Sequence, residues 1–420
     1  MATSNSLAGP PQGEDAAGAY AGLFTQSPAE QLRLFADMRS LYPTRTIARG
    51  ERILELTPGA PLEFRYEVDG RSLGIDEFMQ RGRCAGLLLQ HRGRIVLERY
   101  ALGNTPDTRW ISFSMAKSIT STLIGAALHE GLIDSLDDAV TRTVPQLRGS
   151  AYEGVTIRHV LQMSSGVRWI ETYLDPQSDR RQLLQLQSRA LPGAVIEYLR
   201  TLPRAAEPGS HFNYNTAETF LLGAILAEAI RRPLEGTHGS AKFPDPRSAG
   251  LTSSSRPART VSDYLSEKIW QRCGMQADAY WQLESPGGQE FTGSGLSACL
   301  RDYARFGAFV LADGVIDGVR VLPQGWIAES TAVAPASIHA PGKLPGYEPL
   351  GYGYQWWTFP AAAGRRVFGA LGIFGQQIYV DVDAQLVIVL NSAWPEPVHE
   401  KSRLESYVFF DAATRALRGR

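Results

Sequence analysis

The sequence predicts an α+β fold in which an antiparallel sheet is assembled from the two ends of the chain. Strand-like runs occur early, at residues 85–90 and 94–100, and late, at residues 377–382 and 386–390, whereas residues 141–232 have mainly helical patterns. Strands segregated from helices in this way are typical of α+β proteins. We therefore expect N- and C-terminal helices to flank the sheet and a mostly helical part to be inserted in the middle.

The expected domain organisation follows from these runs. Residues 1–25 are rich in Ala, Gly, Ser and Pro and are expected to form a disordered lead before one folded unit at residues 26–420. Within that unit we expect a sheet-containing part at about 26–140 and 285–420 and a helical part at about 141–284.

Local patterns place the early elements. Ser27 begins a capping-box pattern with Pro28 at the first helical position and Glu30 at the third, so a helix is expected to start here. The two early strands flank Arg92 and Gly93, and a turn of two residues between strands predicts a hairpin.

The elements that follow are also marked by periodicity and breakers. An almost wholly apolar helix is expected from about 114 to 129, stopped by Gly131, and a helix that is apolar on all sides must be buried. A stretch rich in Gly, Ser, Pro and Arg at residues 231–260 predicts a flexible insertion. Further helices are expected at about 261–270 and 398–417.

Composition limits the partners of the protein. The 420 residues carry a formal net charge of −1, with 44% hydrophobic and 20% charged residues, an ordinary globular balance. Nucleic-acid binders usually show a basic surplus, and no run of like charge marks a membrane-binding surface, so neither partner is expected. Without a long apolar run or a secretory signal, we expect a cytoplasmic protein.

Metals and cofactors are not expected either. Cys84, Cys273 and Cys299 are odd in number and far apart, which favours neither a zinc site nor a disulfide framework. The seven histidines form no metal-binding pair, and no glycine-rich nucleotide loop is present. The lack of a G-x-S-x-G elbow argues against an α/β-hydrolase.

Ser114 and Lys117 form an S-x-x-K tetrad at the start of the buried helix. Residues three apart share a helix face, so the lysine nitrogen can lie beside the serine hydroxyl. A serine needs a neighbouring base to become a nucleophile, and burial disfavours the charged form of lysine, so Lys117 can take that proton. The Ser114 N–H, unpaired in the first turn, can form half of an oxyanion hole. The competing interpretation is a surface helix start with a solvated lysine.

Two further elements accompany the tetrad. Tyr214 precedes an apolar helix at 220–229, and a phenol near a cationic lysine has its ionised form favoured, so Tyr214 can act as general base or acid. Alone, it would more often be a packed aromatic. Gly372 and Gly375 lie where a late strand enters the final hairpin, where a strand edge can supply the second oxyanion N–H. A glycine bulge explains this stretch equally well by itself.

In this order, the tetrad, the tyrosine motif about a hundred residues later and the glycine-containing strand resemble serine β-lactamases and penicillin-binding proteins. The resemblance extends from about residue 85 to the end and implies a β-lactamase-like fold. It implies that Ser114 is acylated, that Lys117 takes its proton and that Tyr214 relays a proton to the leaving group. It also implies an oxyanion hole made by the backbone N–H groups of Ser114 and Ile373.

Within that superfamily the chain resembles 6-aminohexanoate-dimer hydrolases, the nylon-oligomer hydrolases, and related carboxylesterases. The segment at 171–176 is similar to a loop whose tyrosine hydrogen-bonds the scissile amide nitrogen, which implies that Tyr173 assists amide cleavage. Gln376 lies in a similar late motif and is expected to contact substrate. Trp356 and Trp357 are expected either to line an apolar acyl pocket or to be core or rim aromatics.

Three features depart from the family pattern. The usual Y-S-N or Y-A-N triplet is Tyr214-Asn215-Thr216 here, so a substrate-binding amide at Asn215 would be displaced by one position. The K-T-G triplet is absent, since Ala370 and Leu371 bring neither cation nor hydroxyl, which argues against strong β-lactamase activity. The insertion at residues 231–260 is the third departure.

The predicted function is a serine hydrolase that cleaves amide or ester bonds of small linear substrates through an acyl-serine intermediate. The alternatives are a carboxylesterase or acyltransferase of the same fold and, less favoured, a β-lactamase, a DD-peptidase or a non-catalytic binding member. A binding module has no need to keep Ser114, Lys117 and Tyr214 together, which disfavours the last alternative. A homodimer is left open.

Overall fold

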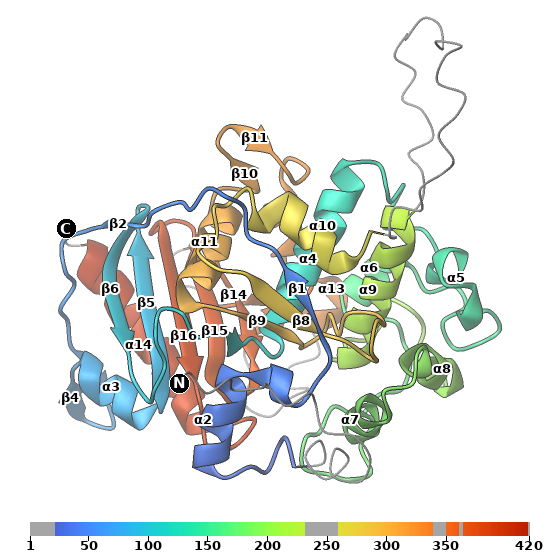
Figure 1. Cartoon of the computed structure of the whole chain (residues 1–420), viewed down its shortest axis with the longest axis horizontal. Helices are drawn as coiled ribbons and strands as arrows, with labels where there is room; N and C mark the ends of the chain where they lie inside the picture. The colour runs from blue at the N-terminus through green and yellow to red at the C-terminus, as the bar shows by residue number, and fades with distance from the viewer. Residues whose placement is uncertain (1–21, 232–258, 339–349, 361–363, 419–420) are drawn as a thin grey trace, which may run out of the picture.

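The computed structural model describes residues 22–231, 259–338, 350–360 and 364–418. Most of the lead expected at 1–25 and of the insertion expected at 231–260 lies outside these residues. An eight-stranded sheet contains strands from both ends of the chain, which confirms the predicted α+β architecture. Figure 1 shows the blue strands of the early hairpin beside the red strands of the late one.

The main sheet is antiparallel except at one edge, where β2 runs parallel to β6. The early and late hairpins, β5–β6 and β15–β16, are joined through pairing of β16 with β5. In spatial order the strands are β12 (Gly351–Tyr352), β13 (Trp357–Thr358), β14 (Val367–Gly372), β15 (Gln376–Asp381), β16 (Leu386–Ser392), β5 (Cys84–His91), β6 (Arg94–Tyr100) and β2 (Thr57–Pro58).

Both faces of this sheet are covered, because alternate residues of a strand point to opposite sides. On β16, Val387 and Val389 join a core with α4 (Met115–His129) and α11 (Leu300–Leu311). Ile388 and Leu390 join a second core with α3 (Ile75–Arg81) and α14 (Glu400–Arg418). The central strands are therefore apolar on both sides, and α4 lies against one face of the sheet.

A second sheet of four short strands was not expected from the sequence. Its strands come from distant segments, and β8 falls inside the part expected to be helical. In spatial order they are β1 (Thr44–Ile47), β8 (Ala279–Gln282), β9 (Leu296–Ala298) and β7 (Trp110–Ile111). Two small hairpins complete the strands: β3 (Tyr66–Val68) with β4 (Arg71–Leu73), and β10 (Val315–Ile316) with β11 (Val319–Arg320). Because β7 leads directly into α4, this sheet positions the start of that helix.

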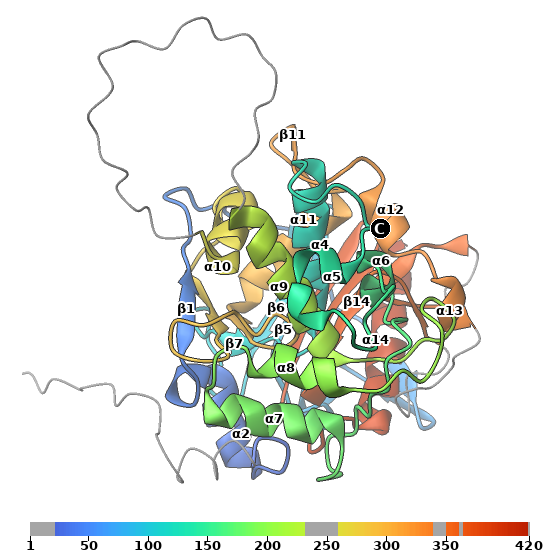
Figure 2. The same cartoon turned by 90° about the vertical axis from the view of Figure 1, so that its right-hand side faces the viewer.

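The middle of the chain is mainly helical, as expected, and Figure 2 shows the green helices α7, α8 and α9 grouped together. The helices of this middle part of the chain are α5 (Val140–Thr143), α6 (Ile157–Leu161), α7 (Asp179–Arg189), α8 (Ala194–Thr201), α9 (Thr216–Arg231) and α10 (Val261–Leu265). The remaining elements are α2 (Pro28–Ala36), α12 (Trp326–Ser330), α13 (Pro335–Ile338), the 3-10 turns η1 (Met38–Ser40), η2 (Pro145–Leu147) and η5 (Ile373–Gly375), and the π-helical turn η3 (Ser266–Trp270).

Helix α4 has the boundaries that its sequence predicts. Ser114 occupies the N-cap, and every residue from Met115 to Ala127 is buried. Gly131 adopts a φ of 71° and donates to Leu128 O, while the following amide donates to Ala127 O. This pair of bonds is a Schellman motif, which needs the left-handed conformation that glycine adopts without strain.

The capping box of the first helix is also confirmed. The Ser27 hydroxyl accepts from Glu30 N, and the Glu30 carboxylate accepts from Ser27 N. Within the described residues no helix is long and apolar enough to cross a membrane. Over the same residues, no group of three or more His, Cys, Asp or Glu side chains is arranged to hold a metal ion.

Candidate active site

Ser114 lies at the junction between β7 and α4. It takes the N-cap position of α4 and is 8% exposed. Phe113, just before it, has a φ of 42°, a left-handed conformation that costs a bulky residue on the order of 1–3 kcal/mol. A sharp turn therefore presents the Ser114 hydroxyl at the positive end of a buried helix.

Lys117 lies one helical turn along from Ser114, as the tetrad predicts. Its Nζ is 3.1 Å from Ser114 Oγ, 3.1 Å from Thr216 Oγ1 and 2.7 Å from the Gly293 carbonyl oxygen. The side chain is 1% exposed, and burial lowers the pKa of Lys117 to about 7. A substantial fraction of Lys117 is therefore a neutral amine near neutral pH, beside the serine hydroxyl.

Tyr214 shares this site. Its ring centroid lies 5.0 Å from Lys117 Nζ, and its side chain is 3% exposed. Burial raises the pKa of Tyr214 well above the ordinary value, while interaction with the Ser114 hydroxyl opposes that rise. The sequence led us to expect that the ionised phenol would be favoured. Burial has the larger effect, so Tyr214 is a neutral phenol that can donate a proton.

The end of β14 approaches the turn that carries Ser114. A Cβ atom on Gly372 would lie 2.5 Å from the Ser112 carbonyl oxygen and 3.2 Å from Ser114 N. No side chain fits there, which gives this glycine a positional role rather than that of a simple bulge. Because Ile373 follows directly, the two backbone N–H groups expected for an oxyanion hole lie on adjoining segments.

Three phenylalanines hold these two segments together. Phe374, just after Ile373, has a φ of 58°, so a left-handed residue flanks both expected N–H donors. The Phe113 and Phe374 ring centroids are 5.5 Å apart. Phe35 of α2 lies 5.1 Å from each of the two rings and is fully buried. We call Phe35, Phe113 and Phe374 the phenylalanine cluster; its packing offsets the strain in both turns.

Gln376 supports the same turn from inside the protein. Its Oε1 accepts from Trp110 Nε1 at 2.9 Å and from Ser392 N at 3.1 Å. Its Nε2 donates to the carbonyl oxygens of Ile373, Phe374 and Ser392. Gln376 is fully buried, and both ends of its amide are engaged, so it braces the Ile373 turn instead of contacting substrate as the sequence led us to expect.

Asn215 and Thr216, the second and third residues of the family triplet, have different roles in the structure. Asn215 Oδ1 accepts from the backbone N of Ala217 at 2.9 Å and of Glu218 at 3.2 Å. This is a helix-capping arrangement at the start of α9, so the structure gives the carbonyl oxygen of Asn215 a capping role. Thr216 takes the third triplet position and bonds Lys117.

Tyr173 is placed close to this site. Its side chain is 7% exposed, and its hydroxyl lies 3.4 Å from Glu171 Oε1. Its phenol also helps to raise the pKa of Tyr214, after burial and Tyr352. The loop after residue 170 thus brings Tyr173 to the catalytic candidates.

The two adjacent tryptophans separate to opposite sides of the chain. Trp356 is fully buried in the core, with ring centroids 6.4 Å from Phe306 and 5.3 Å from Phe368. Trp357 stacks on Tyr214, with centroids 5.6 Å apart and ring planes 24° apart. Trp357 is therefore adjacent to the site, whereas Trp356 is a core residue and lines no acyl pocket.

Three participants were missed by sequence reasoning. Glu171 and Thr216 hydrogen-bond each other, and Thr216 and the Gly293 carbonyl both bond Lys117. The displaced triplet already drew attention to Thr216, which stands where the family has asparagine. Glu171 lies in the segment at 171–176, in which the family resemblance implied a role only for Tyr173. A backbone carbonyl such as that of Gly293 leaves no trace in sequence.

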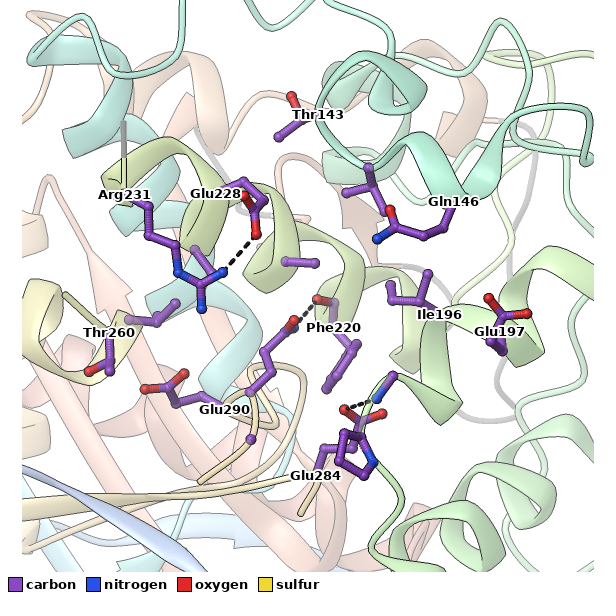
Figure 3. A pocket seen from close by; sticks show the side chains of 18 of the residues that line it. Thr143, Gln146, Ile196, Glu197, Phe220, Glu228, Arg231, Thr260, Glu284 and Glu290 are labelled. Carbon is purple, nitrogen blue, oxygen red and sulfur yellow. Dashed lines mark hydrogen bonds and ion pairs between the residues drawn. The ribbon is translucent and has the colours of Figure 1, made fainter. Parts of the chain in front are cut away.

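A large cavity lies away from this site. It measures about 950 Å³ and is lined by residues of α5, α8 and α9, and none of the catalytic candidates is among them (Figure 3). Its charged side chains are paired within the protein: Arg231 with Glu228 at 2.7 Å, and Glu290 with Arg45 at 2.7 Å. Glu284 accepts from two backbone amides at the start of α8. These groups are satisfied without a ligand, so the cavity is not our candidate active site.

Comparison with known proteins identifies the family. The beta-lactamase family model matches residues 75–411. The 6-aminohexanoate-dimer hydrolase of Paenarthrobacter ureafaciens is 30% identical over 372 residues, which cover 86% of this chain and 85% of that protein.

Solved structures share the fold. A Bacillus anthracis protein provisionally named 6-aminohexanoate-dimer hydrolase aligns with a TM-score of 0.75 at 22% identity, over 94% of this chain and 97% of its own. EstCE1, a hydrolase with promiscuous acyltransferase activity, aligns with a TM-score of 0.52 at 16% identity, over 81% and 96% of the two chains. The chain belongs to the beta-lactamase family and is a hydrolase related to 6-aminohexanoate-dimer hydrolase.

Proposed function

We propose that this hydrolase cleaves amide or ester bonds of small linear substrates through an acyl intermediate on Ser114. The observation that carries the proposal is the buried Lys117 amine, 3.1 Å from Ser114 Oγ and with its pKa lowered to about 7. A buried lysine with such a pKa, directly beside a helix-cap serine, has the properties of a general base.

The chemical steps use the groups at the site. Lys117 Nζ takes the hydroxyl proton as Ser114 Oγ forms a bond to the substrate carbonyl carbon. The carbonyl oxygen becomes an oxyanion, which accepts hydrogen bonds from the N–H groups of Ser114 and Ile373. Tyr214 donates a proton to the leaving nitrogen or oxygen as the scissile bond breaks. Lys117 then passes the serine proton to the Tyr214 phenolate, which restores both groups. Water attacks the acyl carbon, Lys117 takes its proton, and that proton returns to Ser114 Oγ as the ester bond breaks.

The site favours substrates without the carboxylate arrangement of β-lactams. Ala370 and Leu371, which stand where the family places a cation and a hydroxyl, are both buried apolar residues. They offer no hydrogen bond to a substrate carboxylate. Small linear amides and esters make no such demand, which supports them as the substrate class.

The position of Tyr173 supports an enzyme that cleaves amides and not only esters. An amide nitrogen is a poor leaving group and needs a proton donor, whereas an activated ester does not. Tyr173 bonds Glu171, which in turn bonds Thr216, two residues after Tyr214, and the 30% identical relative from Paenarthrobacter ureafaciens is named 6-aminohexanoate-dimer hydrolase. These observations support a linear ω-amino acid amide as the first substrate to test.

The experiment compares a short-chain p-nitrophenyl ester with the 6-aminohexanoate linear dimer. Ser114→Ala and Lys117→Ala should lose cleavage of both, and Tyr173→Phe should lose cleavage of the dimer selectively. If Ser114→Ala keeps wild-type activity, the proposed mechanism is wrong. If Tyr173→Phe cleaves both at the wild-type ratio, the amide preference is not set by Tyr173.

A further inference from the structure

We propose that Glu171 is a positioning residue that, through the Thr216 hydroxyl, fixes the direction of the hydrogen bonds at Lys117, so that the amine lone pair faces Ser114. This inference rests on the proposed acyl-serine function. It rests on a series of hydrogen bonds in which the donor or acceptor role of each group determines the role of the next.

Glu171 is surrounded by hydrogen-bond donors. Its Oε2 accepts from Thr216 N at 3.0 Å and from Trp169 Nε1. Its Oε1 accepts from the hydroxyls of Thr216 and Tyr173, and Arg180 Nε lies 3.8 Å from it. The side chain is 6% exposed, so these groups rather than water surround it. A carboxylate, which only accepts, fits this environment, whereas an amide would turn two N–H bonds toward donors.

The Thr216 hydroxyl is thereby fixed as an acceptor toward Lys117. A hydroxyl has a single proton, and the proton of Thr216 is used in its bond to Glu171 Oε1. The contact of 3.1 Å between Thr216 Oγ1 and Lys117 Nζ must then be a bond donated by the lysine.

Two N–H bonds of Lys117 are committed in this way. A carbonyl oxygen only accepts, so the contact of 2.7 Å to the Gly293 oxygen uses the second N–H. A neutral amine has two N–H bonds and one lone pair. With both N–H bonds engaged, the lone pair is the group left to face Ser114 Oγ at 3.1 Å. The neutral Lys117 is held in the one orientation in which it accepts the serine proton.

The charged groups around Lys117 make the role of Glu171 visible in the pH dependence of the rate as well. Burial lowers the pKa of Lys117 most, Glu171 raises it, and Arg180 lowers it. The ring of Tyr214 also faces the amine, at 5.0 Å, and that phenol is neutral. Replacing Glu171 with Gln removes the raising influence, so the acid limb of the rate profile should move to lower pH. A loss of activity through misfolding would leave that limb in place.

The experiment measures kcat and KM for the p-nitrophenyl ester from pH 5 to 9. The variants are Glu171→Gln, Thr216→Val, the double variant and Thr216→Ser, which keeps a hydroxyl. We expect kcat to fall on the order of 10²- to 10⁴-fold in Glu171→Gln and Thr216→Val, the range for loss of a positioned general base, with KM little changed. Because Glu171 positions Lys117 through Thr216, the double variant should be no slower than the slower single variant. Thr216→Ser should restore most of the activity.

Glu284→Gln is the matched control. Glu284, which follows β8, is also a buried carboxylate that accepts two backbone N–H groups, but these donors are Gly193 and Val195 at the start of α8, outside the candidate site. It should keep the wild-type pH profile whatever its effect on stability.

The outcomes distinguish this inference from the function on which it rests. If Ser114→Ala is inactive while Glu171→Gln and Thr216→Val retain wild-type kcat, the positioning role of Glu171 is refuted and the acyl-serine mechanism stands. Multiplicative losses in the double variant, or an unmoved acid limb in Glu171→Gln, also refute it. A wild-type rate in Ser114→Ala refutes the proposed function itself.

Discussion

Substitution of Gly372 by alanine tests the proposed oxyanion hole, because it inserts one methyl group between the two segments proposed to form it. The added Cβ would lie 2.5 Å from the Ser112 carbonyl oxygen and 3.2 Å from Ser114 N. Both contacts are with backbone atoms, which cannot rotate away as a side chain can. The segments must separate by roughly 0.5–1 Å to restore ordinary contact, and catalytic donors are effective only at about 2.7–3.1 Å from the oxyanion.

Loss of one oxyanion donor typically lowers kcat by about 10²- to 10³-fold, and we expect Gly372→Ala to show a loss of this size. The assay is kcat for the p-nitrophenyl ester, measured at a temperature where circular dichroism shows the variant to be folded. Gly369→Ala is the control, because Gly369 lies in the same strand, β14, and its Cβ would meet the Ile378 carbonyl oxygen of β15 at 2.9 Å, away from Ser114. If both variants lose kcat equally, or if Gly372→Ala keeps the wild-type value, the reasoning is refuted.

Three further predictions follow from the same geometry. The kcat/KM for the ester should rise with pH through about 7, since protonated Lys117 cannot take the serine proton. At two pH units below that value about 1% of the limiting rate should remain, and a flat profile from pH 5 to 9 would contradict this. Tyr214→Phe should lower dimer cleavage on the order of 10²-fold more than cleavage of the p-nitrophenyl ester, whose leaving group needs no proton; equal losses would argue against the donor role. Phe35→Ala should reduce the free energy of unfolding in urea by about 3–5 kcal/mol and also lower kcat of the folded variant, whereas an unchanged kcat would separate the phenylalanine cluster from the site.

The elements that depend on local patterns were predictable from the sequence. The capping box at Ser27, the hairpin around Gly93 and helix α4 with its stop at Gly131 all depend on neighbouring residues. The contact between Ser114 and Lys117 was predictable for the same reason, because helical periodicity brings residues three apart together. Even the lowered pKa of Lys117 followed from the apolar character of its helix.

The parts that depend on distant segments were not predictable. The second sheet is built from strands of two to four residues, too short for an alternating pattern to be recognised. The role of Gln376 depends on Trp110 and Ser392, which meet it only in the folded sheet. For Trp356 the sequence left core and pocket open, since a strand directs successive side chains to opposite faces and only the packed structure shows which face is which.

The site shows the same limit. The donors around Glu171 come from α7, from α9 and from its own loop, so no spacing in the sequence predicts a carboxylate behind Lys117. The cap that Asn215 makes on α9 was also not predictable, because asparagine suits a helix cap and a substrate contact equally well.

Trapping of the acyl intermediate tests the central claim most directly. The wild-type enzyme and Ser114→Ala would be mixed with p-nitrophenyl acetate, quenched rapidly in acid during turnover, digested, and mapped by mass spectrometry. The mechanism predicts one acetyl group on the peptide that contains Ser114 in the wild type, and neither adduct nor turnover in Ser114→Ala. An acetyl group on a different residue that turns over with the substrate, or full turnover by Ser114→Ala, would contradict it.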